Sequence, residues 1–143
     1  MMKKQTLDTM FSSGNDEWET PKHIYDFFIN RGYEDINPIN CKWDALEIKW
    51  FDKTFCNPPY SRKLMPLFIN KAIEQSKLGK DIILLIPSRT DTKYFHALLN
   101  EGVEIIFLDK RLRFSNKAPA PFPSLIIHLN ANTKNSILNF QDL

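Results

Sequence analysis

The sequence lacks the features that mark disulfide-rich, metal-binding or membrane-spanning chains. Its 143 residues contain only two cysteines and four glycines. Cys41 and Cys56 lack the CxxC spacing of zinc sites, so we expect reduced thiols, no disulfide framework and no metal. The longest apolar run, 82–86, is far shorter than the roughly 20 residues of a membrane span, and the opening MMKKQTLDTMF has no apolar signal-peptide core. We therefore expect a cytoplasmic protein with no membrane partner.

A large excess of one charge is also absent. Nineteen Lys and Arg against seventeen Asp and Glu give a net charge of +2, so contacts with nucleic acid must come from a local patch. The hydrophobic share of 43% and the aromatic share of 13% are typical of a folded globular chain and exclude a disordered one. We expect a flexible lead-in over residues 1–13 and a single domain over residues 14–143.

Apolar patterning predicts alternating strands and helices. Thr20 and Pro21 suit a helix cap and a first helical position, and further helices are expected at about 64–78 and 92–100. Strands are expected at 33–36, 53–56, 82–86, 103–108 and, as the last one, 124–129. The unbroken apolar run at 82–86 favours a strand buried on both faces of a parallel sheet. The alternation predicts an open α/β sheet with right-handed crossovers, whose ligands bind beyond the carboxyl ends of the strands.

The sharpest chemical signal is the tetrapeptide that follows the strand expected at 53–56. Two successive prolines, Pro58 and Pro59, remove two backbone donors and stiffen the turn. The Asn57 amide and the Pro58 carbonyl then offer two acceptors at a nearly fixed separation, which suits an amino group with two hydrogens. Tyr60 adds a flat face on which a planar base can stack. The alternative is a rigid turn with a surface tyrosine.

Five stretches of the chain occur in the order in which one enzyme family carries them. They are MFSSGNDEWETPKHIYD (10–26), CNPPYSRK (56–63), LLIPSRTDTKYFH (84–96), FLDKRLRF (107–114) and APFPSLII (120–127). In these stretches the chain resembles the phage-type, Dam-like DNA N6-adenine methyltransferases of phages and prophages. The resemblance implies a minimal single domain of the α/β class, a Rossmann-like methyltransferase sheet with flanking helices, in a bacterial or phage-infected cell.

The resemblance also implies the reaction and its cofactor. A methyl group would pass from S-adenosyl-L-methionine (SAM) to N6 of an adenine flipped out of DNA. The catalytic residues would be Asn57, Pro58, Pro59 and Tyr60. The residues implied for the cofactor are Trp18, Thr20, Pro21, Asp35, Pro38, Asn40 and Asp44. Of these, Asp44 would hold the ribose or adenine of SAM, and the element around Trp18 would close over its methionine end. Ile36 and Asn37 depart from the family's pattern.

A basic patch is the candidate DNA-binding surface. Its members are Arg62, Lys63, Arg89, Lys110, Arg111, Arg113 and Lys117. No acidic residue lies between Lys110 and Lys117, and Phe114 and Phe122 on the same loop system favour an edge that faces DNA. The alternative is an ordinary solvated face. We expect recognition of the DNA sequence to come from short loops such as 61–66 and 109–123.

Two other functions stay open at this stage. The tetrapeptide at 57–60 also serves methyltransferases that act on amino groups of RNA or protein. A second possibility is a non-catalytic member of the fold that binds DNA or a partner, because the segment at 35–50 is short for a cofactor site. His23, His96 and His128 show no catalytic pairing, and we expect His128 to be a satisfied residue within a strand.

Overall fold

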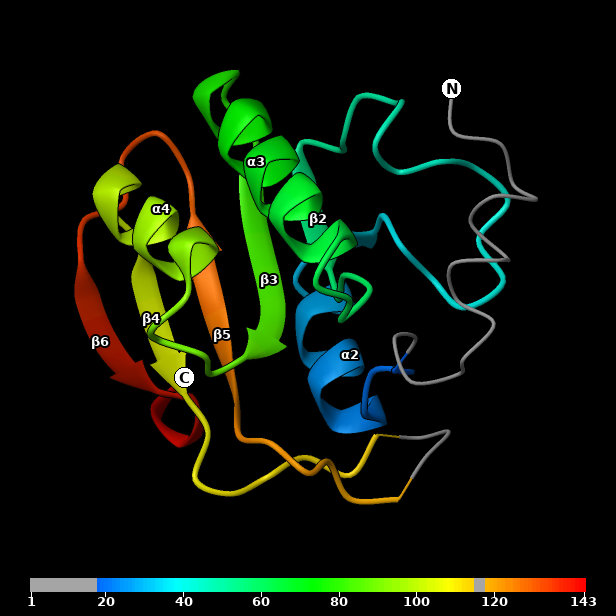
Figure 1. Ribbon diagram of the computed structural model, residues 1–143, viewed down its shortest axis with the longest axis vertical. Helices are drawn as coiled ribbons and strands as arrows, with labels where there is room; N and C mark the ends of the chain where they lie inside the picture. The colour runs from blue at the N-terminus through cyan, green and yellow to red at the C-terminus, as the bar shows by residue number, and fades with distance from the viewer. Residues whose placement is uncertain (1–17, 115–117) are drawn as a thin grey trace.

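A mixed sheet organises the computed structural model, which describes residues 18–114 and 118–143 (Figure 1). The lead-in predicted for residues 1–13 lies outside the described residues. The strands of the described part are β1 (Glu34–Asp35), β2 (Lys53–Cys56), β3 (Asp81–Pro87), β4 (Glu104–Phe107), β5 (Ser124–Leu129) and β6 (Ser136–Asn139). They form one six-stranded sheet in the order β1-β2-β3-β5-β4-β6. The predicted α/β class is therefore confirmed.

Strand direction differs from the prediction at β5. β1, β2 and β3 are parallel, and β4 and β6 run the same way, but β5 lies antiparallel between β3 and β4. The physical reason is the course of the connection from β4 to β5. It leaves the sheet at Phe107 and re-enters at Ser124 of the same edge, so β5 runs back beside β4 in the opposite direction. The carboxyl ends of the other strands consequently meet at one edge, the lower one in Figure 1.

Helices cover both faces of this sheet. α3 (Leu64–Lys77) and α4 (Lys93–Glu101) lie on one face and α2 (Lys22–Ile29) on the other (Figure 1). Ile82, Leu84 and Ile86 of β3 join the core with α3 and α4, whereas Ile83 and Leu85 join the core with α2. All five are buried, so the predicted two-sided burial of this strand is confirmed. Within the described residues, no helix has the length and apolar character required to cross a membrane.

The starts of α2 and α4 each differ by one residue from the predicted starts. Pro21 is the cap residue of α2 and not its first helical residue, so the predicted start is wrong by one position. The Thr20 hydroxyl does not cap the helix and accepts a hydrogen bond from Asn57 Nδ2. The helix predicted from residue 92 begins at Lys93, and Thr92 is its cap, because its Oγ1 accepts from the Phe95 amide at 3.3 Å.

Thr92→Ala should lower the free energy of unfolding by about 1 kcal/mol, because the first turn of α4 loses its side-chain acceptor. Thr92→Ser keeps that acceptor and should stay within about 0.5 kcal/mol of the parent. Urea unfolding followed by circular dichroism measures both. Equal losses in the two variants would show that the cap contributes nothing.

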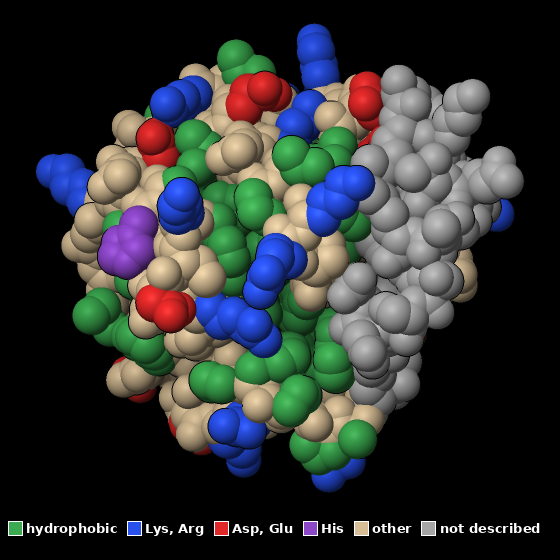
Figure 2. All heavy atoms as spheres, in the orientation of Figure 1, with side chains coloured by type: hydrophobic (Ala, Val, Ile, Leu, Met, Phe, Trp, Pro, Cys, Tyr) green, Lys and Arg blue, Asp and Glu red, His purple; other side chains and the backbone are tan. Residues whose placement is uncertain are grey.

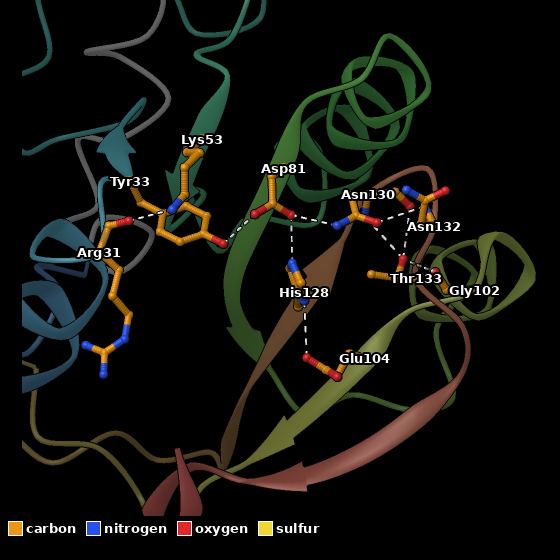
Figure 3. A network of polar contacts seen from close by, with 10 residues as sticks. All are labelled: Arg31, Tyr33, Lys53, Asp81, Gly102, Glu104, His128, Asn130, Asn132 and Thr133. Carbon is orange, nitrogen blue, oxygen red and sulfur yellow. Dashed lines mark hydrogen bonds and ion pairs between the residues drawn. The ribbon is translucent and has the colours of Figure 1, made fainter.

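A polar network closes the amino edge of the sheet, opposite to the edge where the parallel strands end (Figure 3). His128 lies between two carboxylates, with Nε2 at 2.7 Å from Asp81 and Nδ1 at 3.1 Å from Glu104. Tyr33 donates to Asp81 at 2.6 Å and Asn130 donates to it at 2.9 Å. Burial acts to raise the pKa of Asp81, but these hydrogen bonds outweigh it and lower the pKa below its ordinary value. His128 is thus the satisfied strand residue that the sequence predicts.

Candidate active site

The ends of β1 and β2 are tied together beside the predicted catalytic tetrapeptide. Asp35 of β1 stands opposite Phe55 of β2 in the parallel pair. The Asn37 side chain donates from Nδ2 to the Asn57 carbonyl at 3.0 Å, and its amide donates to Asp35 Oδ1 at 3.0 Å. Sequence reasoning set Asn37 aside as a departure from the family pattern. Its role becomes visible only when the strands are paired, because 20 residues separate it from Asn57.

Asn57 presents a buried acceptor without a partner. Its Nδ2 donates to the Trp18 carbonyl at 2.5 Å and to Thr20 Oγ1 at 3.0 Å. A carbonyl oxygen can only accept, so the amide nitrogen must face Trp18 and Oδ1 must face the other way. Oδ1 is buried and has no hydrogen-bond partner within residues 18–114 and 118–143. A buried unpaired acceptor costs roughly 1–3 kcal/mol, and an amino group donated by a ligand removes that cost.

Tyr60 belongs to a cluster of four aromatic rings, Trp18, Tyr60, Phe114 and Phe122, which we call the aromatic cluster. Its hydroxyl donates to the Leu85 carbonyl of β3 at 2.9 Å, which fixes the ring. The Trp18 ring lies at 26° to it with centroids 6.5 Å apart, and the two phenylalanine rings stand edge-on to it at 6.1 and 5.6 Å. Burial raises the pKa of the Tyr60 hydroxyl well above its ordinary range, so this group stays neutral and is no proton acceptor.

The expectation for Phe114 is wrong. This side chain is completely buried and packs against Trp18 at a centroid distance of 5.2 Å, so it does not face DNA. Its ring covers the apolar surfaces of Trp18 and Tyr60, and an exposed ring would leave those surfaces in water. Phe122 stays partly exposed on the same loop.

Asp35 is a half-buried carboxyl group at the end of β1. Burial raises its pKa to about 6, against the smaller lowering effect of the hydrogen bond from the Asn37 amide. A carboxyl group held with so high a pKa is a candidate functional group, because a nearby positive charge restores its ionised form.

Asp44 is a second acid among the predicted cofactor residues, and it is buried. It is 4% exposed, and its Oδ1 accepts from the Leu46 amide at 3.0 Å. Its Oδ2 is buried with no partner in the described part of the chain. Trp43 Nε1 donates to the Ile36 carbonyl at 2.8 Å, which holds this turn beside the end of β1. The free Oδ2 can therefore accept a hydrogen bond from a ligand hydroxyl or amine.

Three further residues predicted for the cofactor are Pro21, Pro38 and Asn40. Pro21 caps α2 as a buried residue, and Pro38 is half-buried in the loop after β1. Asn40 is exposed, with a φ of 61° that asparagine tolerates in turns.

The predicted basic residues do gather at the carboxyl edge. They follow β2 (Arg62, Lys63), β3 (Arg89) and β4 (Lys110, Arg111, Arg113), and all six are exposed. Lys117 lies outside the described residues. Lys and Arg side chains surround a hollow that exposes hydrophobic groups between α3 and α4 (Figure 2). The residues after β4 line a second hollow of about 460 Å³ with His23 and Phe140.

Comparison with known proteins assigns the chain to a family. The family model described as DNA N-6-adenine-methyltransferase (Dam) matches residues 37–141. The chain belongs to the Dam family. A DNA N-6-adenine-methyltransferase of Escherichia phage T1 is 30% identical over 112 residues, which cover 68% of this chain and 46% of that protein. The chain thus spans about half the length of this curated relative.

The Dam-family match covers some predicted site residues and not others. It includes the tetrapeptide at 57–60, Asp44 and the described basic residues, but it begins after Trp18, Thr20 and Asp35. The phage-type resemblance seen in the sequence is confirmed at the level of the family. The segment before the match joins the site through the hydrogen bonds that Asn57 makes with Trp18 and Thr20.

Proposed function

We propose that this Dam-family chain transfers a methyl group from SAM to N6 of an adenine flipped out of DNA. The observation that carries the proposal is the buried, unpartnered Oδ1 of Asn57 beside two stiff prolines, unpartnered within the described residues. This oxygen and the Pro58 carbonyl accept the two hydrogens of the adenine amino group. An adenine within a duplex cannot reach a buried acceptor, so it has to leave the base stack.

The arrangement of strands supports a Rossmann-like methyltransferase domain over residues 14–143. The parallel strands β1 and β2 end side by side, and α2 and α3 cover opposite faces of the sheet. In open α/β sheets, ligands bind in the crevice beyond such strand ends. Asp35 ends β1 and Asn57 follows β2, and the hydrogen bond from Trp43 to Ile36 holds the turn of Asp44 beside the end of β1.

The residues present fit SAM, because a buried and a half-buried carboxyl group with spare acceptor capacity suit its hydroxyl groups and positive charge. Asp44 Oδ2 would accept from a cofactor hydroxyl, and Asp35 would face positive charge in its ionised form. Trp18 and Thr20 would cover the bound cofactor from the segment that Asn57 already holds. When bound, SAM supplies a methyl group that is already activated for transfer.

The protein's own part in the reaction is alignment. Asn57 and Pro58 hold the amino nitrogen in line with the methyl group, and the Tyr60 face supports the base. No side chain needs to remove a proton first, because the proton can leave N6 after the transfer. Tyr60 cannot serve as a base, since burial raises the pKa of its hydroxyl and its hydrogen is donated to Leu85.

One experiment tests the proposal directly. The chain is incubated with radiolabelled SAM and, in separate reactions, with mixed-sequence DNA, RNA and a protein extract. Label in N6-methyladenine recovered from the DNA supports the proposal. Label in RNA or protein alone would reassign the substrate, and SAM binding in calorimetry without transfer would indicate a non-catalytic member of the fold.

Replacing Arg111 and Arg113 by Gln should weaken DNA binding for every sequence. Each lost phosphate contact removes roughly 0.9 from the slope of log affinity against log salt concentration. Fluorescence anisotropy of labelled duplexes at several salt concentrations measures the slope. Lys134→Gln, an exposed cation near the start of β6 at the opposite edge, is the matched control. An unchanged slope in the double variant would return these residues to an ordinary solvated face.

A further inference from the structure

A cleft of about 590 Å³ opens where α3 and α4 begin. We call it the α3–α4 cleft; among the residues that line it are Tyr60, Arg62, Asn70, Arg89, Lys93 and Tyr94. Its volume is within the roughly 300–1,000 Å³ of sites that hold small ligands. Asn70, Lys93 and Tyr94 have no place in the reaction proposed above.

The charge of the α3–α4 cleft favours an anion. Arg62, Arg89 and Lys93 lie on it as exposed cations, and within the described chain no Asp or Glu is among its lining residues. Asp91, the nearby acid, is exposed and outside the lining. Such a concentration of positive charge without acids is complementary to a phosphate group.

The walls of the α3–α4 cleft suit a flat, partly apolar group. Tyr60 and Tyr94 supply aromatic surface, and Met65, Pro66 and Ala97 supply aliphatic surface. Asn70 is exposed on α3 and offers one acceptor and two donors. An asparagine amide can make two hydrogen bonds to the edge of one base. Cations, flat apolar walls and one amide together match a nucleotide.

Two residues join the α3–α4 cleft to the reaction site. Tyr60 lines the cleft and also belongs to the aromatic cluster, and its hydroxyl bond to Leu85 keeps its ring in place. The Arg89 guanidinium lies 5.8 Å from the centroid of the Phe122 ring in that cluster. The Arg89 carbonyl accepts from the Thr92 hydroxyl at 2.8 Å, which holds its backbone at the start of α4.

We propose that the α3–α4 cleft binds the nucleotide next to the target adenine on the same DNA strand and reads its base. Its phosphate lies among Arg62, Arg89 and Lys93, and its base lies against Tyr94 within reach of Asn70. The proposal rests on the proposed function, since it places the neighbour of the adenine that Asn57 holds. It makes Asn70 a specificity-determining residue.

A methylation experiment with randomised duplexes tests the role of Asn70. The parent chain, Asn70→Ala and the control Lys134→Gln each methylate the library with SAM, and the positions of N6-methyladenine are read by sequencing. The parent and the control should share a base preference beside the methylated adenine. Asn70→Ala should lose about tenfold of that preference, the lower part of the range for a two-bond contact. The same preference in Asn70→Ala would overturn the proposal.

A crosslinking experiment separates binding from turnover. Duplexes that carry 5-iododeoxyuridine are irradiated with the protein, and the crosslinked peptides are identified by mass spectrometry. We expect crosslinks at Tyr94, and we expect the Lys93→Gln variant to have a salt slope smaller by roughly 0.9. Methylation by the parent without crosslinks at Tyr94 would overturn the cleft proposal alone. Crosslinks at Tyr94 without methylation would overturn the proposed function while supporting DNA binding in the cleft.

Discussion

Asn57→Ala lowers the rate of DNA methylation by about 10²–10³-fold, the usual cost of losing one aligned donor or acceptor at a reacting atom. The variant loses the buried Oδ1 that has no partner in the described chain, so nothing replaces it at the amino group. The affinity for SAM should stay within a few-fold of the parent, because Asp35 and Asp44 remain. Single-turnover kinetics and calorimetry measure the two quantities separately.

Two further variants separate the acceptor role of Asn57 from its structural role. The sequence alone favours Asn57→Asp as a partly active variant, because a carboxylate keeps an acceptor. The structure reverses this expectation, since Nδ2 donates to the Trp18 carbonyl at 2.5 Å and a carboxylate there meets another acceptor. Asn57→Asp should therefore be as inactive as Asn57→Ala. Thr20→Val removes only one acceptor of Nδ2 and should cost about tenfold or less. Parental rates in Asn57→Ala would make the tetrapeptide a rigid turn without a catalytic role.

Asp35→Asn raises the stability of the free protein at pH 7.5 by about 2 kcal/mol. The folded-state pKa of about 6 lies above the ordinary value of 3.8, so the folded state binds more protons than the unfolded state between these two values. Stability of the parent therefore falls as the pH rises from about 4 to about 6, and the loss is complete above that window. Asparagine keeps the acceptor for the Asn37 amide and has no charge to bury. Urea unfolding between pH 4 and 8 measures the difference.

The same substitution weakens SAM binding. The positive charge of bound SAM should lower the Asp35 pKa toward its ordinary value. If it lowers the pKa by about one to two, loss of the carboxylate lowers the affinity for SAM by about 10–100-fold. In the parent, affinity should also fall as the pH drops below about 6, and Asp35→Asn should remove that dependence. Asp52→Asn, at a largely exposed side chain paired with Lys80, is the control. If Asp35→Asn binds SAM as tightly as the parent does, Asp35 is excluded from the cofactor site.

The sequence predicts those strands and helices that have an unbroken apolar run or a clear end signal. β3 is recognisable because its apolar residues form an unbroken run, and the end of α4 because Gly102 follows it. β6 is missed because it is a four-residue strand, SILN, in which Ile137 is 67% exposed. The reversed direction of β5 is also invisible in its own residues, since a buried apolar strand reads alike in both directions. The preceding connection decides it.

The candidate site is predictable where one short motif contains its chemistry. The tetrapeptide at 57–60 identifies Asn57 as a positioning group, but it gives no sign that Nδ2 is already used. That information depends on Trp18 and Thr20, which lie 39 and 37 residues away in the chain. Asn37 is missed for a related reason, because a family pattern reports departures without showing which new contacts they make.

The antiparallel position of β5 lets the connection 108–123 vary in length at its outer part, whereas Leu112, Phe114 and Ala120 of this connection belong to the core. This connection leaves the sheet at Phe107 and returns at Ser124, which lie at the same edge on neighbouring strands. The Ala120 amide donates to the Leu112 carbonyl, and the backbones of Arg113 and Pro119 form an isolated antiparallel β-bridge. Lengthening the chain beyond that bridge leaves the register of the sheet unchanged and costs only about 0.6 kcal/mol for each doubling of loop length. The connection 36–52 has no such freedom, because it must return from one edge of the sheet to the other. The chain length between Arg113 and Pro119 can therefore vary while the sheet stays unaltered.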